Sequence, residues 1–122
     1  MKFRKGFRLL TLGWSDGNTF MPVNSCLIAS SKESNIISPT KDFDKRSIAD
    51  KRRKLAQTKA PEAMMTLLDT ALSAGLKANY VLFDSWFSNL AQITAIHSKG
   101  MDVIAMIKKS SWIKYAYCGE QL

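Results

Sequence analysis

One carboxylate in this sequence stands where a buried strand is expected to end. Residues 80–83 form a short apolar run, and Asp84 follows it without a turn residue. Such a run is typical of a strand covered on both faces. A carboxylate there costs desolvation free energy unless a cation or hydrogen-bond donors contact it. Two roles are open for Asp84. It could be one of the several carboxylates that hold a pair of Mg²⁺ ions for phosphodiester chemistry, or it could cap the helix that follows.

The other acidic residues are not expected to complete a metal cluster with Asp84. Asp102 begins the next predicted strand, whereas Asp84 ends a parallel neighbour, so the two lie at opposite ends of a sheet, roughly 15 Å apart. Asp69 falls within a predicted helix, and Glu120 lies near the chain end in a segment typical of a polar turn. The residues themselves therefore predict a single metal ligand, Asp84.

The remaining chemically versatile side chains favour structural roles. His97, the only histidine, lies in the last turn of a predicted helix, where the carbonyl ends favour a cation. Cys26 and Cys118 form no CxxC pair, so neither a zinc site nor a disulfide framework is indicated, and a reducing cytosol fits. Asp16 precedes Gly17 in a predicted turn and is expected to be a turn former.

Composition favours a basic globular chain with a polyanionic partner. The chain has 122 residues, 46% of them hydrophobic, and a net charge of +8, which fits one domain over residues 1–122. Lysine and arginine displace the counterions condensed on phosphate backbones, so nucleic acid is the expected partner. No signal peptide and no apolar run of bilayer length is predicted.

The cations gather in a polar connecting segment, residues 31–59, that has no strand pattern. Ser47 and Asp50 could cap a short helix within it. A solvated loop with a helical turn and an arm that follows phosphates are both open interpretations. The candidate DNA contacts, which include two lysines after the last predicted strand, are Lys45, Arg46, Lys51, Arg52, Arg53, Lys54, Lys108 and Lys109.

Turn signals and apolar periodicity predict the elements that must position these residues. A hairpin spans residues 6–30, and Pro22 indicates that its second strand lies at a sheet edge or carries a bulge. A helix begins near Pro61 and ends at Gly75, and the strand of residues 80–83 follows. A second helix, from about Phe87 to Lys99, ends at Gly100, and a third apolar strand covers residues 103–107. This order predicts an α/β sheet with an antiparallel half and a parallel half.

The apolar residues of the two predicted helices indicate which faces should be buried. These residues are Met64, Leu68, Ala71 and Leu72 in the first helix and Leu90, Ile93 and His97 in the second.

Five blocks of sequence, in this order and spacing, carry a resemblance to a known family. They are "KGFRLLTLGWSDGNTFMPV", "DKRSIADKRRK", "KAPE", "YVLFDSWFS" and "GMDVIAMIKK". Together they closely resemble the middle of bacterial insertion-sequence transposases of the insertion-sequence-four type, from Lys5 to about Lys109.

The resemblance implies an RNase H-like core: a mixed sheet with an antiparallel hairpin, parallel strands and helices. It also implies an Asp-Asp-Glu triad that binds two Mg²⁺ or Mn²⁺ ions and carries out strand cleavage and strand transfer at transposon ends. In that family the second Asp of the triad ends the fourth strand, and the matching residue here is Asp84. The resemblance thus makes Asp84 a metal ligand and a catalytic residue.

The sequence also departs from the family pattern. The first Asp of the triad ends a strand that precedes the "KGFRLL" strand, where only Met1 to Lys5 stand, and the Glu belongs to a helix beyond Leu122. We therefore expect a partial RNase H-like domain that lacks the first core strand and two of the three carboxylates. Loss of a central strand leaves two inner edges unpaired, so marginal stability is expected.

Two functional hypotheses follow. The first is an internal fragment of a transposase catalytic domain, inactive without a complementing chain. The alternative is a non-catalytic basic DNA-binding fragment, or an inhibitor of transposition that competes for DNA or joins a full-length transposase. The expected partners are transposon-end DNA and either full-length transposase or a second copy, and the expected location is the bacterial cytoplasm, at the nucleoid.

Overall fold

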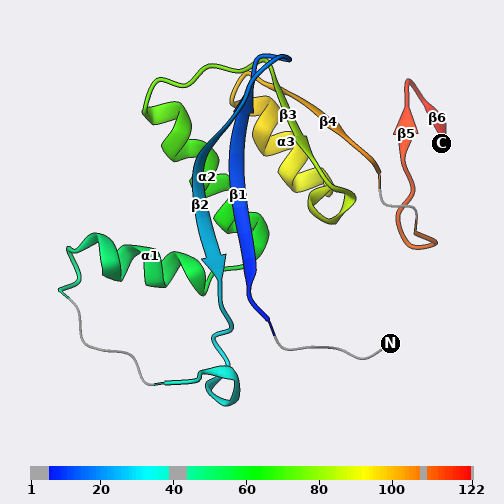
Figure 1. Cartoon of the computed structure of the whole chain (residues 1–122). Helices are drawn as coiled ribbons and strands as arrows, with labels where there is room; N and C mark the ends of the chain where they lie inside the picture. Colours follow the sequence, from blue (N-terminus) through cyan, green and yellow to red (C-terminus); the bar gives the residue numbers. More distant parts are fainter. Residues whose placement is uncertain (1–5, 39–43, 108–109, 122) are drawn as a thin grey trace. The chain divides into compact units, whose positions relative to one another are not determined.

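A computed structural model describes residues 6–38, 44–107 and 110–121 (Figure 1). The chain divides into two compact units, Met1–Leu76 and Lys77–Leu122. The fold is mixed α/β, with an antiparallel hairpin, a parallel strand pair and helices, and this combination is consistent with an RNase H-like core. Among the described residues the strands form three two-stranded sheets.

The first unit is built on the predicted hairpin, β1 (Arg8–Ser15) and β2 (Phe20–Ile28). An Asp-Gly pair is typical of a tight primed turn with two positive φ angles, but this expectation is wrong here: the loop runs from Asp16 to Thr19, and only Gly17 of the pair has a positive φ, 94°. The Asp16 carboxylate accepts hydrogen bonds from the backbone amides of Asn18 and Thr19, at 2.9 and 2.7 Å. These bonds hold the longer loop and confirm Asp16 as a turn former.

The second strand carries the bulge that Pro22 indicated. Leu12 lies opposite Asn24 and Gly13 lies opposite Pro22, so one residue of β2 has no counterpart on β1. Proline has no amide hydrogen to donate to the ladder, and a bulge removes the need for one. The Phe20 ring lies over Gly13 and occupies the space that a side chain there would need.

The polar connecting segment contains more helix than one turn. After a short 3₁₀ helix, η1 (Glu33–Asn35), the nine-residue helix α1 spans Ile48–Ala56. Ser47 caps it as predicted, because its hydroxyl oxygen accepts a hydrogen bond from the backbone amide of Asp50 at 3.2 Å. The expectation of a single helical turn is therefore too short.

Helix α2 (Ala60–Ser73) supplies most of the core of the first unit. Met64, Leu68 and Ala71 are buried as predicted. Gly75 ends the helix with a φ of 93°, and the amides of Gly75 and Leu76 bond back to the carbonyls of Leu72 and Ala71.

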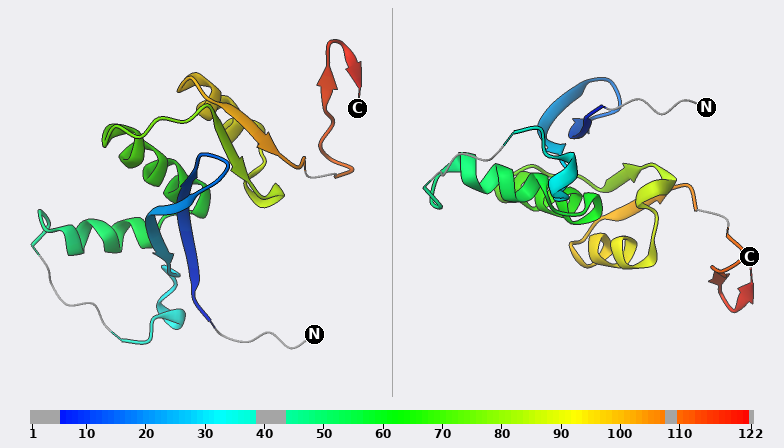
Figure 2. Two further views of the ribbon diagram at one scale, coloured as in Figure 1. Left: turned by 45° about the horizontal axis from the view of Figure 1, so that its top comes forward. Right: turned by 90° about the horizontal axis from the view of Figure 1, so that it is seen from below.

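A small apolar cluster joins α2 to the hairpin. Its buried members are Cys26, Ala63 and Leu67, and side chains from β1, β2 and α1 pack against them. The side-chain amide of Asn24 also donates to the carbonyl of Leu67 at 3.1 Å. Figure 2 shows both helices of this unit on the same side of the hairpin.

The second unit contains the parallel pair β3 (Tyr80–Phe83) and β4 (Asp102–Ala105), joined through η2 (Ser85–Phe87) and α3 (Leu90–Ser98). Helix α3 packs on one face of the pair (Figure 2). The predicted start of this helix at Phe87 is wrong, because residues 85–87 form a separate 3₁₀ turn. Gly100, with a φ of 86°, ends the segment as predicted.

The buried face of α3 differs from the predicted one. Leu90 is 73% exposed and His97 is also exposed, whereas Ile96 is fully buried. Most residues of this helix are apolar, so its sequence has no single favoured face, and the contact with β4 selects the face that carries Ile96.

Within the second unit, the described residues cover one face of the parallel pair. Val81 and Phe83 are half-buried, whereas Tyr80 and Leu82 on the alternate positions are exposed. The alternate side chains of a strand point to opposite faces, and α3 packs on one face of this pair, so the described part of the second unit does not by itself cover residues 80–83 on both faces. Near the chain end, β5 (Ala116–Tyr117) and β6 (Glu120–Gln121) form a small hairpin.

Candidate functional site

Asp84 lies where the sequence placed it, directly after β3 and at the carboxyl end of the parallel pair. It is also the N-cap of η2: its Oδ1 accepts a hydrogen bond from the backbone amide of Trp86 at 3.4 Å and from the Ser85 hydroxyl at 3.0 Å. Both bonds go to the same oxygen. No hydrogen bond or ion pair to Oδ2 is found among the described residues, and Asp84 is exposed.

Aromatic contacts fix the turn that carries Asp84. The Phe87 ring is buried and meets the Phe83 ring edge-on, with centroids 6.3 Å apart. The centroid of the Trp86 ring lies 5.3 Å from that of Phe87. A carboxylate held by a short turn between packed rings has few rotamers to lose when it binds a ligand.

The two alternatives for Asp84 turn out to be compatible. Asp84 caps a turn, as the structural alternative proposed, although it does not cap the helix: Asn89 caps α3 by accepting from the backbone amide of Gln92 at 2.9 Å. Sequence reasoning missed Asn89, although the Asn-x-x-Gln spacing is a variant of the capping box and could have revealed it. Capping uses Oδ1 of Asp84 and leaves Oδ2 available to a further ligand.

The remaining acids do not gather at Asp84 in the part of the second unit that the structure describes. The ladder pairs Tyr80 with Asp102, so Asp102 lies at the opposite end of the pair from Asp84, as predicted. There its Oδ1 lies 3.4 Å from Nδ1 of His97, and both side chains are largely exposed. Glu120 lies in β6, in a hairpin rather than a helix.

The described residues alone do not fit a two-metal centre. No group of three or more His, Cys, Asp or Glu side chains among them could hold a metal ion. Asp84 offers one carboxylate, whereas a pair of divalent cations needs several oxygen ligands. The further ligands of such a centre would therefore have to come from outside the described residues.

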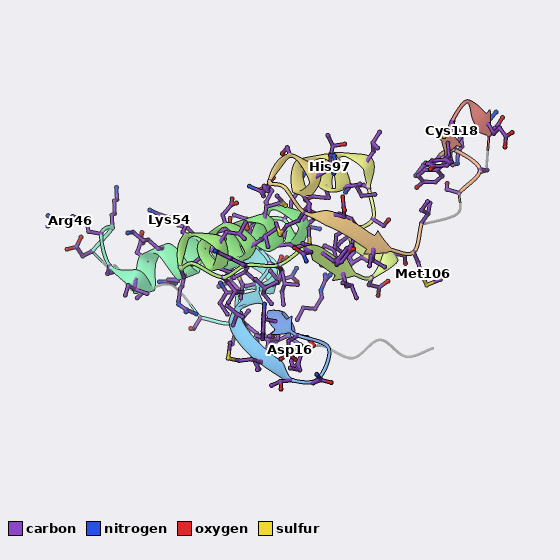
Figure 3. The ribbon with its side chains drawn as sticks, turned by 90° about the horizontal axis from the view of Figure 1, so that it is seen from above. Asp16, Arg46, Lys54, His97, Met106 and Cys118 are labelled. Carbon is purple, nitrogen blue, oxygen red and sulfur yellow. The ribbon has the colours of Figure 1, made fainter. Side chains whose placement is uncertain are left out.

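Most of the predicted DNA contacts lie on or next to α1. Lys51, Arg52 and Lys54 are exposed and Arg53 is half-buried. Lys45 and Arg46 are exposed in the turn that leads into the helix. Figure 3 shows Arg46 and Lys54 in this part of the chain. The two remaining predicted contacts, Lys108 and Lys109, lie outside the described residues.

Internal ion pairs neutralise part of this charge. Nζ of Lys54 lies 2.8 Å from Oδ2 of Asp50, whose side chain is only 18% exposed. Nε of Arg46 lies 3.5 Å from Oδ1 of Asp44, and this second pair is fully solvated. Lys51 and Arg52 have no acidic partner among the described residues. These two cations of α1 can therefore bind an external anion without first breaking an ion pair.

The two cysteines, Cys26 and Cys118, are free. Cys26 lies in the core of the first unit, and burial raises the pKa of its thiol, although the nearby Arg52 guanidinium acts in the opposite direction. A buried thiol of raised pKa is a poor nucleophile, so Cys26 serves packing. Cys118 is exposed in the β5–β6 turn with a φ of 51°.

Helices long and apolar enough to cross a bilayer are absent from the described part of the chain.

Comparison with known proteins gives one positive finding: a family model described as DDE superfamily endonuclease matches residues 1–114. Searches of curated proteins and of solved structures found no match. The matched region includes the hairpin, the polar connecting segment of residues 31–59 and Asp84, and it covers nearly the whole sequence. The chain therefore belongs to the DDE superfamily endonuclease family.

Proposed function

We propose that this chain is part of the catalytic domain of an insertion-sequence transposase, of the insertion-sequence-four type, and that it acts in DNA strand cleavage and strand transfer. Membership of an endonuclease family supports DNA as the substrate. The sequence blocks that resemble transposases support the finer assignment. Both hypotheses from the sequence share this partner, so they differ only in whether the chain takes part in the chemistry.

The observation that carries the proposal is the state of the Asp84 carboxylate. Its Oδ1 is held by the amide of Trp86 and the hydroxyl of Ser85, which fixes the direction of the group. No hydrogen bond to its Oδ2 is found among the described residues, and Asp84 is exposed at the carboxyl end of a parallel strand, where such sheets commonly place ligands. A carboxylate prepared in this way suits one position in a shared Mg²⁺ or Mn²⁺ site.

The proposal includes a requirement for further carboxylates. Because Asp84 is a single ligand, we propose that the described residues cannot cut or join DNA by themselves. Activity would need acidic side chains supplied by another part of the polypeptide, by full-length transposase or by a second copy. Within that assembly this chain would contribute the Asp84 oxygen, the rigid turn behind it and the basic helix α1.

A cleavage assay tests both parts of the proposal. Transposon-end DNA is incubated with the chain and Mg²⁺ or Mn²⁺, with and without a full-length transposase whose own residue matching Asp84 has been replaced. We expect nicking only in the mixture, and its loss when this chain carries Asp84→Ala. The matched control is Asp102→Ala, which removes an exposed acid at the other end of the same strand pair and should leave nicking unchanged.

Two results would contradict this scheme. Nicking by the chain alone that depends on Asp84 would show that its own acids complete the centre. Complemented nicking that survives Asp84→Ala would show that this carboxylate is not part of the site. Circular dichroism of each variant confirms that the fold is retained.

A second candidate function is favoured by the exposed cations of α1. In that role the chain binds DNA through Lys51, Arg52 and their neighbours without cutting it, and so inhibits transposition by competition. Its affinity would fall steeply with salt and would be indifferent to Asp84→Ala. A flat salt dependence would count against DNA binding by α1.

A further inference from the structure

The serine that follows Asp84 makes the shorter of the two hydrogen bonds that this carboxylate accepts. The Ser85 hydroxyl donates to Oδ1 of Asp84 at 3.0 Å, whereas the backbone amide of Trp86 donates to the same oxygen at 3.4 Å. An N–H···O bond is usually about 2.9–3.0 Å long, so the bond from the amide is a weak one. Much of the hold on Oδ1 therefore comes from a side chain that a substitution can remove.

The backbone of η2 brings these two neighbouring side chains together. Asp84 is the N-cap, with an extended backbone (φ −67°, ψ 157°), and Ser85 is the first residue of the 3₁₀ turn. Consecutive side chains within a helix do not face each other. The change from extended to helical backbone between Asp84 and Ser85 allows the contact, so it is a product of the turn.

The turn itself does not depend on the Ser85 hydroxyl. The backbone amide of Phe87 donates to the carbonyl of Asp84 at 3.0 Å. The backbone amide of Ser88 donates to the carbonyl of Ser85 at 3.1 Å, and the buried Phe87 ring packs against Phe83. Removal of the hydroxyl should therefore leave the turn in place and release only the carboxylate.

We infer that Ser85 is a positioning residue for Asp84. Its hydroxyl holds Oδ1, so that Oδ2, which accepts no hydrogen bond among the described residues, is the oxygen available to an outside ligand. The inference rests on the proposed function for the identity of that ligand, but the hold on the carboxylate needs neither metal nor DNA. Partners that orient a liganding carboxylate in this way contribute about 10–100-fold to affinity or activity.

The first test measures the three-bond NMR couplings across χ1 of Asp84 in isotope-labelled protein, without metal or DNA. The wild type should show the couplings of one rotamer, and Ser85→Ala should show averaged couplings. Ser85→Thr keeps a hydroxyl and should restore the single rotamer. The couplings of Asp102 serve as the internal control, because its contact is with His97 at the other end of the strand pair, and they should be equal in all three proteins.

The second test measures nicking in the mixture with the substituted full-length transposase. Ser85→Ala should lower the rate of nicking by about 10-fold or more, and Ser85→Thr should recover most of it. The matched control is Ser98→Ala. It removes a hydroxyl that donates to the carbonyl of Ala95 at 2.6 Å, in the last turn of α3, and should leave nicking unchanged.

Three results would overturn the inference. A single Asp84 rotamer in Ser85→Ala would show that the hydroxyl does not hold the carboxylate. Averaged couplings with unchanged nicking would show that the direction of the carboxylate does not matter, and equal loss of nicking in Ser85→Ala and Ser85→Thr would show that the hydroxyl is not the group at work. Absence of nicking with the wild type would instead contradict the proposed function, while the couplings would still decide whether Ser85 holds Asp84.

Discussion

Neutralising the two unpaired cations of α1 should weaken binding to duplex DNA and make it less sensitive to salt. The variant is Lys51→Gln combined with Arg52→Gln. Both side chains are exposed and neither has an acidic partner among the described residues, whereas Lys54 is paired with Asp50 at 2.8 Å. Removal of Lys51 and Arg52 should therefore remove phosphate contacts without leaving an unpaired carboxylate behind.

The size of the effect follows from the number of contacts. Each phosphate contact contributes about 0.9 to the negative slope of log affinity against log salt concentration. Two lost contacts should reduce this slope by about 1.8. Between about 50 and about 200 mM salt, the wild type should then lose about 12-fold more affinity than the variant.

The assay is a salt titration of affinity on one labelled duplex. The matched control, Lys32→Gln with Lys99→Gln, removes the same net charge from exposed positions outside α1. An equal loss of slope in the control would show that net charge, rather than the position of α1, governs binding. An unchanged slope in the α1 variant would refute phosphate contact by Lys51 and Arg52.

Three further predictions concern the fold that holds these surfaces. Leu67→Ala should lower the free energy of unfolding by about 2–5 kcal/mol in a urea titration, and Leu82→Ala, at an exposed position, by less than about 0.5 kcal/mol. Two backbone amides hold the pKa of Asp16 below its ordinary value of 3.8. Asp16→Ala should therefore lower the free energy of unfolding above pH 3.8. The difference between the variant and the wild type should disappear as the pH falls through the lower pKa of the folded state, and urea titrations at several pH values measure it. Gly13→Ala should destabilise the hairpin by less than about 1 kcal/mol, because the exposed Phe20 ring can turn away from the added methyl group, and Phe20→Ala in the same chain should remove this penalty in thermal unfolding.

Much of the local structure could be predicted because its causes lie within a few residues. Ser47 caps α1, Gly75 and Gly100 end their helices, and Asp16 holds its loop, each through bonds to near neighbours. The position of Asp84 after an apolar run was likewise confirmed. A strand signal and the residue that follows it are both local properties of a sequence.

Features that depend on distant contacts were harder to predict. The exposed cations of α1 could be identified by residue type, but only the fold shows that Asp50 pairs with Lys54 and leaves Lys51 and Arg52 available. The exposure of Trp112 could not be predicted from its residue type, because tryptophan is usually highly buried. Exposure is a property of the packed chain.

The sequence by itself determined the order of the main elements, the cap at Ser47, the helix ends at Gly75 and Gly100, the basic character of residues 45–54 and the carboxylate at the end of β3. The tertiary structure decided that α3 buries Ile96 rather than Leu90, and that Asp84 uses one oxygen for the η2 turn and keeps the other exposed. The physical reason is the separation along the chain of the residues that interact. Caps and turns arise from hydrogen bonds between neighbours, whereas the buried face of a helix and the free side of a carboxylate depend on which distant surfaces pack against them.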